Sequence, residues 1–130
     1  MTQKNIDTMD IIVSKMVDGK RLSEALKEVY SKRNVIIPYT ESILSTSILK
    51  LNMSVRAINS LMRAKLQTIA DVVNYCESKK ITSVKMLGTG AGIELFEAIL
   101  DYSWDHMTLN ERVTFLIDTV ERNEQNLLQS

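Results

Sequence analysis

The chain has 130 residues, about the size of a single domain, with 45% apolar and 25% charged residues. Lysine plus arginine and aspartate plus glutamate number 16 each, so the formal net charge is zero. A free-standing duplex binder is usually basic, so this balance counts against strong nonspecific DNA binding. It is compatible with a local basic face, or with a domain that another protein recruits.

The composition also argues against membrane, metal and catalytic classes of protein. No apolar run approaches the roughly 20 residues of a membrane span, and the N-terminus lacks a secretory signal pattern, so we expect a cytoplasmic protein without a membrane partner. One cysteine (Cys76) and one histidine (His106) leave too few ligands for a typical transition-metal site and few nucleophile–base pairs. We therefore expect no cofactor, no metal and no enzyme activity, and we interpret Cys76 as part of the core.

Four glycines and one proline favour helices with short connections, so the sequence predicts a mainly all-α protein. Apolar periodicity predicts helices over 6–17 and 21–31, the first ended by Asp18-Gly19. The β-branched run in 34–39 predicts a short extended segment, either an edge strand or a buried connector, and 40–48 a linker with a short turn. We expect residues 1–45 to be an N-terminal helical extension that packs on the rest of the protein or on a second copy.

Capping signals divide the remainder of the sequence into further helices. Ser54 is the predicted N-cap of a helix over 55–64, and Thr68, with Asp71 at N3, the cap of a helix over 69–77. A short helix near 80–86 and a helix over 93–102 follow, and Thr108 with Glu111 forms a capping box before a long final helix. The inward-facing residues are predicted to be Val55, Ile58, Leu61 and Met62 in the first of these helices, and Leu109, Val113, Leu116, Ile117 and Val120 in the last.

One side of the 55–64 helix carries polar side chains that suit nucleic acid. Arg56, Asn59, Ser60 and Arg63 lie at i, i+3, i+4 and i+7 and therefore share a face. Arginine enters a narrow minor groove, where the potential is most negative, and asparagine hydrogen-bonds groove edges or phosphates. Periodicity alone leaves a plain solvated helix face as the alternative.

A glycine-rich turn, Gly88-Thr89-Gly90-Ala91-Gly92, precedes the 93–102 helix. Its glycines allow a phosphate to approach free backbone N–H groups, or they cap and closely pack two helices. The turn lacks the Gly-Lys-Ser/Thr ending of a nucleotide-binding loop, which excludes that function.

Several motifs occur in a fixed order between residues 48 and 100. Leu51-Asn52-Met53-Ser54-Val55-Arg56 is followed by Asn59 and Leu61, by Thr68-Ile69, and by Leu87-Gly88 and Glu94. This order and spacing resemble the C-terminal domain of the bacterial RNA polymerase α subunit. The helix, glycine turn and helix also resemble the helix-hairpin-helix motif, which grips the DNA backbone without reading sequence.

The resemblance implies a compact helical bundle with a helix-hairpin-helix-like turn over residues 46–103. It also implies that the family's DNA-contact positions are occupied here by Arg56, Asn59, Ser60, Gly88, Gly90, Ala91 and Glu94. The family's turn usually carries two lysines and a serine where this protein has Thr89, Gly90 and Ala91. We therefore expect DNA affinity either to be weaker than the family's or to depend more on Arg56, Arg63, Lys65 and Lys85.

The sequence thus predicts a DNA-binding transcription modulator that contacts the minor groove and the phosphate backbone through residues 46–103. The alternative is a protein-interaction module with little DNA binding, whose partner is RNA polymerase, a transcription regulator or a second copy in a homodimer. The C-terminal helix, residues 104–130, is expected to pack on the module.

Overall fold

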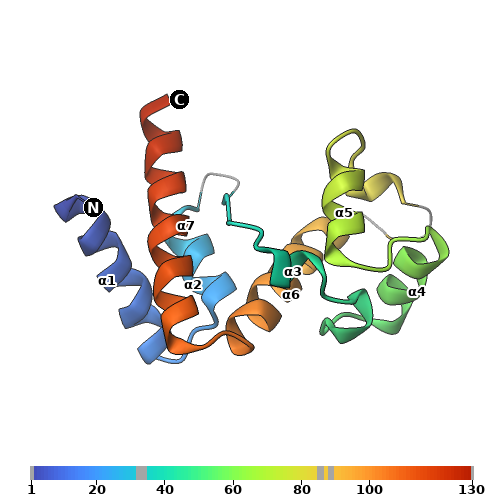
Figure 1. Cartoon of the computed structure of the whole chain (residues 1–130), viewed down its shortest axis with the longest axis horizontal. Helices are drawn as coiled ribbons and strands as arrows, with labels where there is room; N and C mark the ends of the chain where they lie inside the picture. The colour runs from blue at the N-terminus through green and yellow to red at the C-terminus, as the bar shows by residue number, and fades with distance from the viewer. Residues whose placement is uncertain (1, 32–34, 85–86, 88–89, 130) are drawn as a thin grey trace. The chain divides into compact units, whose positions relative to one another are not determined.

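The computed structural model describes residues 2–31, 35–84, 87 and 90–129, with the backbone alone at 82, 91 and 126–129. Over these residues the protein forms seven α-helices, two short 3-10 helices and no strand, which confirms the predicted all-α class (Figure 1). The elements are α1 (Gln3–Val17), α2 (Leu22–Val29), α3 (Glu41–Leu44), η1 (Ile48–Lys50), α4 (Val55–Arg63), α5 (Ile69–Cys76), η2 (Ile81–Ser83), α6 (Ala91–Asp105) and α7 (Leu109–Gln129). None of the helices described is long and apolar enough to cross a membrane.

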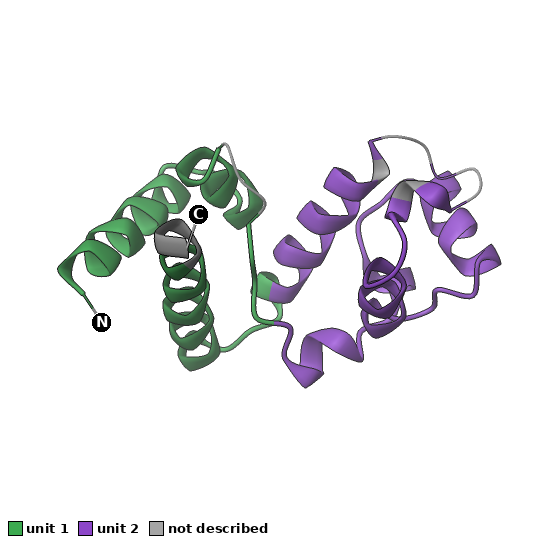
Figure 2. Ribbon diagram, turned by 90° about the horizontal axis from the view of Figure 1, so that it is seen from above, with its two compact units in different colours: residues 1–38, 104–130 green, residues 39–103 purple. Residues whose placement is uncertain are grey.

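The protein divides into two compact units (Figure 2). Unit 1 combines residues 1–38 with 104–130, and unit 2 comprises residues 39–103. Helix α7 belongs to the same unit as α1 and α2. The N-terminal extension therefore finds its packing partner in the C-terminal segment.

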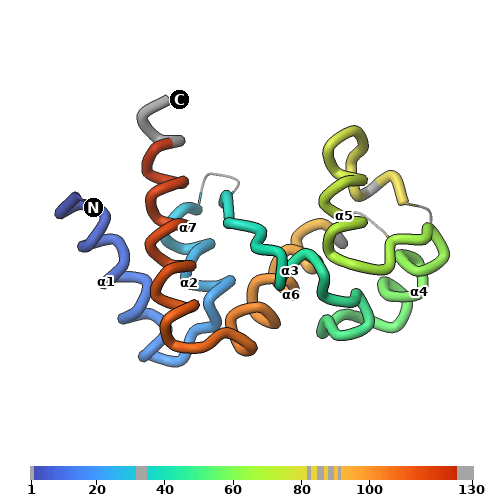
Figure 3. Tube along the Cα trace, viewed as in Figure 1, coloured from blue at the N-terminus to red at the C-terminus, as the bar shows by residue number. Residues whose placement is uncertain are grey.

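Unit 1 is built around contacts of α1 with α2 and α7, segments from opposite ends of the sequence that lie side by side (Figure 3). The Thr2 hydroxyl caps α1 by accepting from the Asn5 N–H at 3.1 Å, and α1 ends before Gly19, whose φ is +105°. The core of this unit contains Ile12, Leu22, Leu26, Phe115, Leu116 and Val120.

The segment before unit 2 is held by an amide group instead of a neighbouring strand. The Ile36 N–H donates to Asn123 Oδ1 at 3.0 Å, and Asn123 Nδ2 donates to the Ile36 carbonyl at 2.8 Å. Asn123 is 1% exposed, and its Nδ2 also donates to the Thr119 carbonyl at 2.7 Å. The segment is therefore the predicted connector and not an edge strand, with Ile37 buried but Ile36 39% exposed, since the amide of Asn123 satisfies the backbone groups that a strand partner would otherwise satisfy.

Unit 2 begins with α3, which lies inside the predicted linker and is capped by Thr40. The predicted caps are confirmed: Ser54 Oγ accepts from the Ala57 N–H at 3.1 Å, and Thr68 and Asp71 cap α5 reciprocally. An isolated antiparallel bridge joins Ser47 to Thr68 and ties the start of η1 to the start of α5. The core of this unit includes Ile48, Leu61, Ile69, Leu95 and Leu100.

Three expectations about burial were wrong. Val55 is 76% exposed because the buried stripe of α4 is centred on Ala57 and Leu61, on the opposite side of the helix. Cys76, at the end of α5, is exposed and not in the core. Leu109 and Val113, in the first turns of α7, are 77% and 46% exposed, whereas Leu116 and Val120 are buried as predicted.

Candidate nucleic-acid interface

Helix α4 separates a buried stripe from an exposed polar face. Ala57 and Leu61 are 5% and 0% exposed and anchor the helix, which leaves Arg56, Asn59 and Arg63 exposed. The amphipathic pattern of the helix therefore presents three of the four predicted face residues to solvent together.

Ser60, the fourth predicted face residue, lies at the buried edge of α4. The residue is 3% exposed, and its hydroxyl donates to the Arg56 carbonyl oxygen at 2.9 Å. The Ser60 hydroxyl thus hydrogen-bonds to the helix backbone one turn earlier, at Arg56.

The face of α4 is locally cationic although the whole protein is neutral. Between Glu41 and Asp71 the sequence has no acidic residue, while it has Lys50, Arg56, Arg63 and Lys65. Within the part of the protein that the structure describes, no ion pair engages Arg56 or Arg63. Because like charges are gathered here and this segment of the sequence has no acidic residue of its own, it attracts anions more strongly than the zero net charge suggests.

Lys65 closes α4 in a backbone conformation that usually belongs to glycine. Its φ is +64°, its N–H donates to the Met62 carbonyl at 3.0 Å, and the Leu66 N–H donates to the Leu61 carbonyl at 2.9 Å. A residue other than glycine costs about 1–2 kcal/mol in this conformation. Nothing in the sequence signalled this strain, since a lysine at a helix end is ordinary.

The N-terminal ends of α4 and α6 meet within unit 2. The Ser54 N–H donates to Glu94 Oε1 at 3.2 Å, and the Glu94 N–H donates to the Gly90 carbonyl at 3.2 Å. The positive ends of two helix dipoles are thereby held next to each other, beside the exposed start of α4. A contact between residues 40 positions apart has no local signal, so the role of Glu94 as a link was missed by sequence reasoning.

The glycine turn combines an open position with a tightly packed one. A side-chain carbon added at Gly90 would meet nothing within 4 Å, whereas one at Gly92 would lie 3.0 Å from Ile81 Cγ2 of η2. Gly92 thus allows close packing, and the space at Gly90 stays open in front of α6. Ala91 is the first residue of α6, and the predicted site residue Gly88, like Thr89 and Lys85, lies outside the described residues.

Comparison with known proteins agrees with the predicted resemblance. Residues 38–99 match the family model of the C-terminal domain of the bacterial RNA polymerase alpha subunit. A DNA-directed RNA polymerase subunit alpha of Onion yellows phytoplasma (strain OY-M) is 35% identical over 81 residues, which are 62% of this protein and 21% of that one. The match thus spans about a fifth of the relative's length. No solved structure shows a significant match.

Proposed function

Since residues 38–99 form a module like the RNA polymerase α C-terminal domain, a DNA-binding and non-catalytic type of domain, we propose that this protein modulates transcription by binding duplex DNA. The observation that carries the proposal is the exposed face of α4, which carries Arg56 and Arg63 without an acidic residue of its own and is joined at its N-terminal end to α6 by the Glu94 carboxylate. Such a surface suits a phosphate backbone and an A·T-rich minor groove.

Each exposed residue of α4 has a distinct proposed role. Arg56 enters the minor groove, where its guanidinium has no competing ion pair among the described residues. Asn59 hydrogen-bonds groove edges or phosphates, and Arg63 and Lys65 pair with phosphates toward the end of the helix. Ser60 acts from inside the helix, through its hydrogen bond to the Arg56 carbonyl.

The start of α6 supplies the second part of the proposed interface. The backbone N–H groups of Gly88, Gly90 and Ala91 receive a phosphate, and the open space at Gly90 leaves room for it. Glu94 acts as a positioning residue, because its carboxylate is occupied by the Ser54 N–H and holds the two helix ends together. Placing a carboxylate beside a phosphate is unfavourable, so its benefit lies in this link.

The proposal predicts moderate, salt-dependent affinity. With only a few cations on the face, roughly two to four phosphate contacts form, and log K falls with log[salt] at a slope of about −2 to −4. The remaining lysines and arginines of the protein are outnumbered by its 16 acidic residues and add little to this slope.

A fluorescence-anisotropy titration of an A·T-rich duplex at several salt concentrations tests the proposal with two variants. Arg56→Ala should bind at least about tenfold more weakly and lower the salt slope by about one. Arg122→Ala removes the same charge from an exposed arginine of α7 in unit 1 and should bind like the parent. Equal effects of the two variants, or binding that ignores salt, would overturn the assignment to α4.

The protein-interaction module predicted as the alternative has one observation in its favour. Thr89, Gly90 and Ala91 stand where the resembled family carries two lysines and a serine, which removes cationic contacts from the turn. Under this alternative the parent protein shows no salt-dependent binding to the duplex. In a pull-down, however, immobilised RNA polymerase still captures the parent protein.

A further inference from the structure

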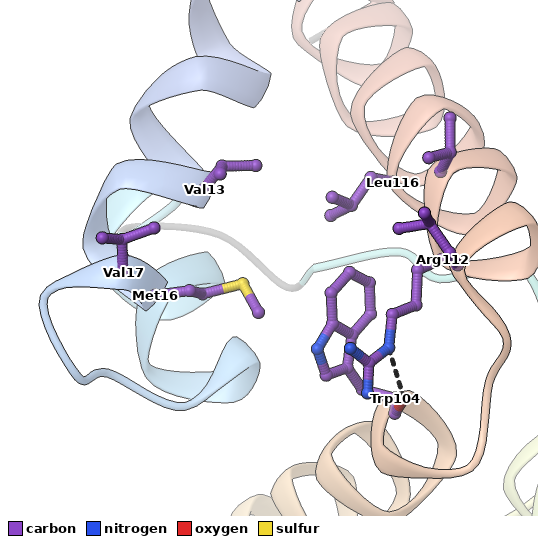
Figure 4. A pocket seen from close by; sticks show the side chains of 8 residues that line it. Val13, Met16, Val17, Trp104, Arg112 and Leu116 are labelled. Carbon is purple, nitrogen blue, oxygen red and sulfur yellow. Dashed lines mark hydrogen bonds between the residues drawn. The ribbon is translucent and has the colours of Figure 1, made fainter.

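Unit 1 contains an apolar pocket of about 360 Å³ between the second half of α1, the end of α6 and the start of α7 (Figure 4). Its apolar lining comes from both helices: Val13, Met16 and Val17 of α1, and Leu109, Val113 and Leu116 of α7. Arg112 is the one charged residue in its lining. The pocket belongs to unit 1 alone and lies apart in sequence from the proposed DNA-binding residues.

The rim of this pocket exposes more apolar surface than a small-molecule site needs. Val17 and Leu109 are 80% and 77% exposed, and Val13 and Val113 are 43% and 46% exposed. A pocket for a small ligand usually buries most of the ligand's surface, whereas contiguous exposed apolar side chains mark an interface with another protein. Exposed apolar side chains on both α1 and α7 favour a partner that fills the pocket and also covers the groove between these two helices.

Arg112 supplies the charged group of this pocket. Its guanidinium carbon lies 4.9 Å from the centroid of the Trp104 ring, and its Nε donates to the Trp104 carbonyl at 3.0 Å. Stacking and this hydrogen bond fix the direction of the guanidinium before any partner arrives.

Arg112 differs from five other cations that the structure describes in unit 1. Carboxylates pair with Lys4, Lys15, Lys20, Arg21 and Arg122. Among the residues described, Arg112 has only its aromatic partner and the Trp104 carbonyl, and no carboxylate. An oriented, unpaired cation at an apolar pocket is complementary to an apolar side chain with a carboxylate close by.

We propose that the groove between α1 and α7 docks an acidic amphipathic helix of a partner protein. An apolar side chain of that helix fills the pocket, and a carboxylate about one turn away pairs with Arg112. A helix fits better than an extended peptide, because the described part of unit 1 offers two helix flanks and no strand edge. Unit 1 then anchors the molecule to a protein while unit 2 binds DNA.

Trp104 is the single tryptophan of the protein and lines the pocket, so its fluorescence reports occupancy directly. The probes are three synthetic helical peptides of about 15 residues with leucine at i, i+3 and i+7, flanked by Glu, Gln or Lys. The Glu peptide should give a saturable change and bind about tenfold more tightly than the Gln peptide, and the Lys peptide should bind most weakly. Equal affinity for all three peptides, or binding of none, would refute the docking site.

Variants of the 130-residue protein test the charge contact and the apolar contact separately. Arg112→Gln should remove the preference for Glu over Gln, and Leu109→Gln should weaken both peptides without a change in the core, since Leu109 is 77% exposed. Val55→Gln, at a 76% exposed valine in unit 2, is the matched control and should bind like the parent.

Two further outcomes would contradict the proposed occupant. Saturation by octanoate as tight as that by the Glu peptide would make the pocket a site for small carboxylates. A change in Trp104 fluorescence with protein concentration alone would make the occupant a second copy of the protein. Duplex binding by Arg112→Gln should match the parent, so failure of this proposal is distinguishable from failure of the DNA-binding proposal.

Discussion

Lys65 combines a strained backbone with an exposed cation at the end of the proposed DNA-binding face. Because its φ is +64°, Lys65→Gly should stabilise unit 2 by about 1 kcal/mol. The same change removes one phosphate contact and should weaken duplex binding several-fold. Urea unfolding followed by circular dichroism and a duplex titration should therefore give effects of opposite sign.

Gly19 is the matched control for this residue, with φ +105° and open space where a side chain would lie. Gly19→Ala should destabilise unit 1 by about 1 kcal/mol, measured by Trp104 fluorescence in urea, and leave duplex binding unchanged. A Lys65→Gly protein that loses both stability and DNA affinity would show that Lys65 supports the fold instead of contacting phosphate.

Glu94 is predicted to act through the Ser54 N–H and not through DNA. Glu94→Gln keeps a carbonyl oxygen that accepts from Ser54 and removes a negative charge near phosphate, so it should bind duplex as tightly as the parent or a few-fold tighter. Glu94→Ala loses the acceptor and should bind more weakly. Glu41→Gln, an exposed acidic residue of α3, measures the general effect of one lost charge. If the Ala and Gln variants bind equally, the link to Ser54 has no role in DNA binding.

Among the helices, local capping chemistry was predictable and packing direction was not. Ser54, Thr68 and Thr108 each accept from a backbone N–H three residues later, a contact that depends only on neighbouring sequence. Val55 was misplaced because the apolar spacing of α4 fits two stripes, and the small side chain of Ala57 decides which one packs. Helix α3 was missed because four residues in a Ser-rich stretch give no periodic signal.

The cap of α5 makes the stability of unit 2 depend on pH. The backbone N–H groups of Gln67 and Thr68 donate to Asp71 Oδ2 at 2.9 and 3.1 Å and hold the pKa of that carboxyl below its ordinary value of 3.8. Because the pKa is lowered by folding, the stabilisation is fully present above pH 3.8 and is lost as the pH falls through the lowered pKa.

Asp71→Asn should therefore unfold at lower urea concentration at neutral pH and lose less stability than the parent on acidification below pH 3.8. Urea midpoints followed by circular dichroism across this range give the comparison, and an NMR titration of the Asp71 carboxyl gives the pKa itself. Parallel curves for the two proteins, or an Asp71 pKa at or above 3.8, would contradict the role of the cap.

At the scale of the whole molecule, the sequence predicted most of the helical segments but gave no signal for which of them share a unit. The face of α4 was predictable because its residues are close in sequence, whereas the link from Ser54 to Glu94 spans 40 positions. The hydrogen bond from the Ile36 N–H to Asn123 Oδ1 spans 87 positions and joins the two terminal segments in unit 1. Such pairings follow from the tertiary fold, so no local pattern signals them.

Asn123 is predicted to be the main polar determinant of unit 1. Asn123→Ala leaves the N–H and carbonyl of Ile36 without their partner in a part-buried setting and should cost about 1–3 kcal/mol. Asn110→Ala, at an exposed asparagine in the first turn of the same helix, should change stability by less than about 0.5 kcal/mol. Urea unfolding followed by Trp104 fluorescence measures both, and similar costs for the two variants would contradict the connector role of Asn123.

The most direct measurement of the central claim is an amide NMR titration of the 130-residue protein with an A·T-rich duplex. The claim is that duplex DNA binds where the exposed face of α4 meets the start of α6. It predicts that the largest shifts fall on residues 54–65 and 90–94, weaken as salt is raised, and disappear in Arg56→Ala but not in Arg122→Ala. Shifts concentrated on α1, α2 and α7, or no shifts at low salt, would contradict it.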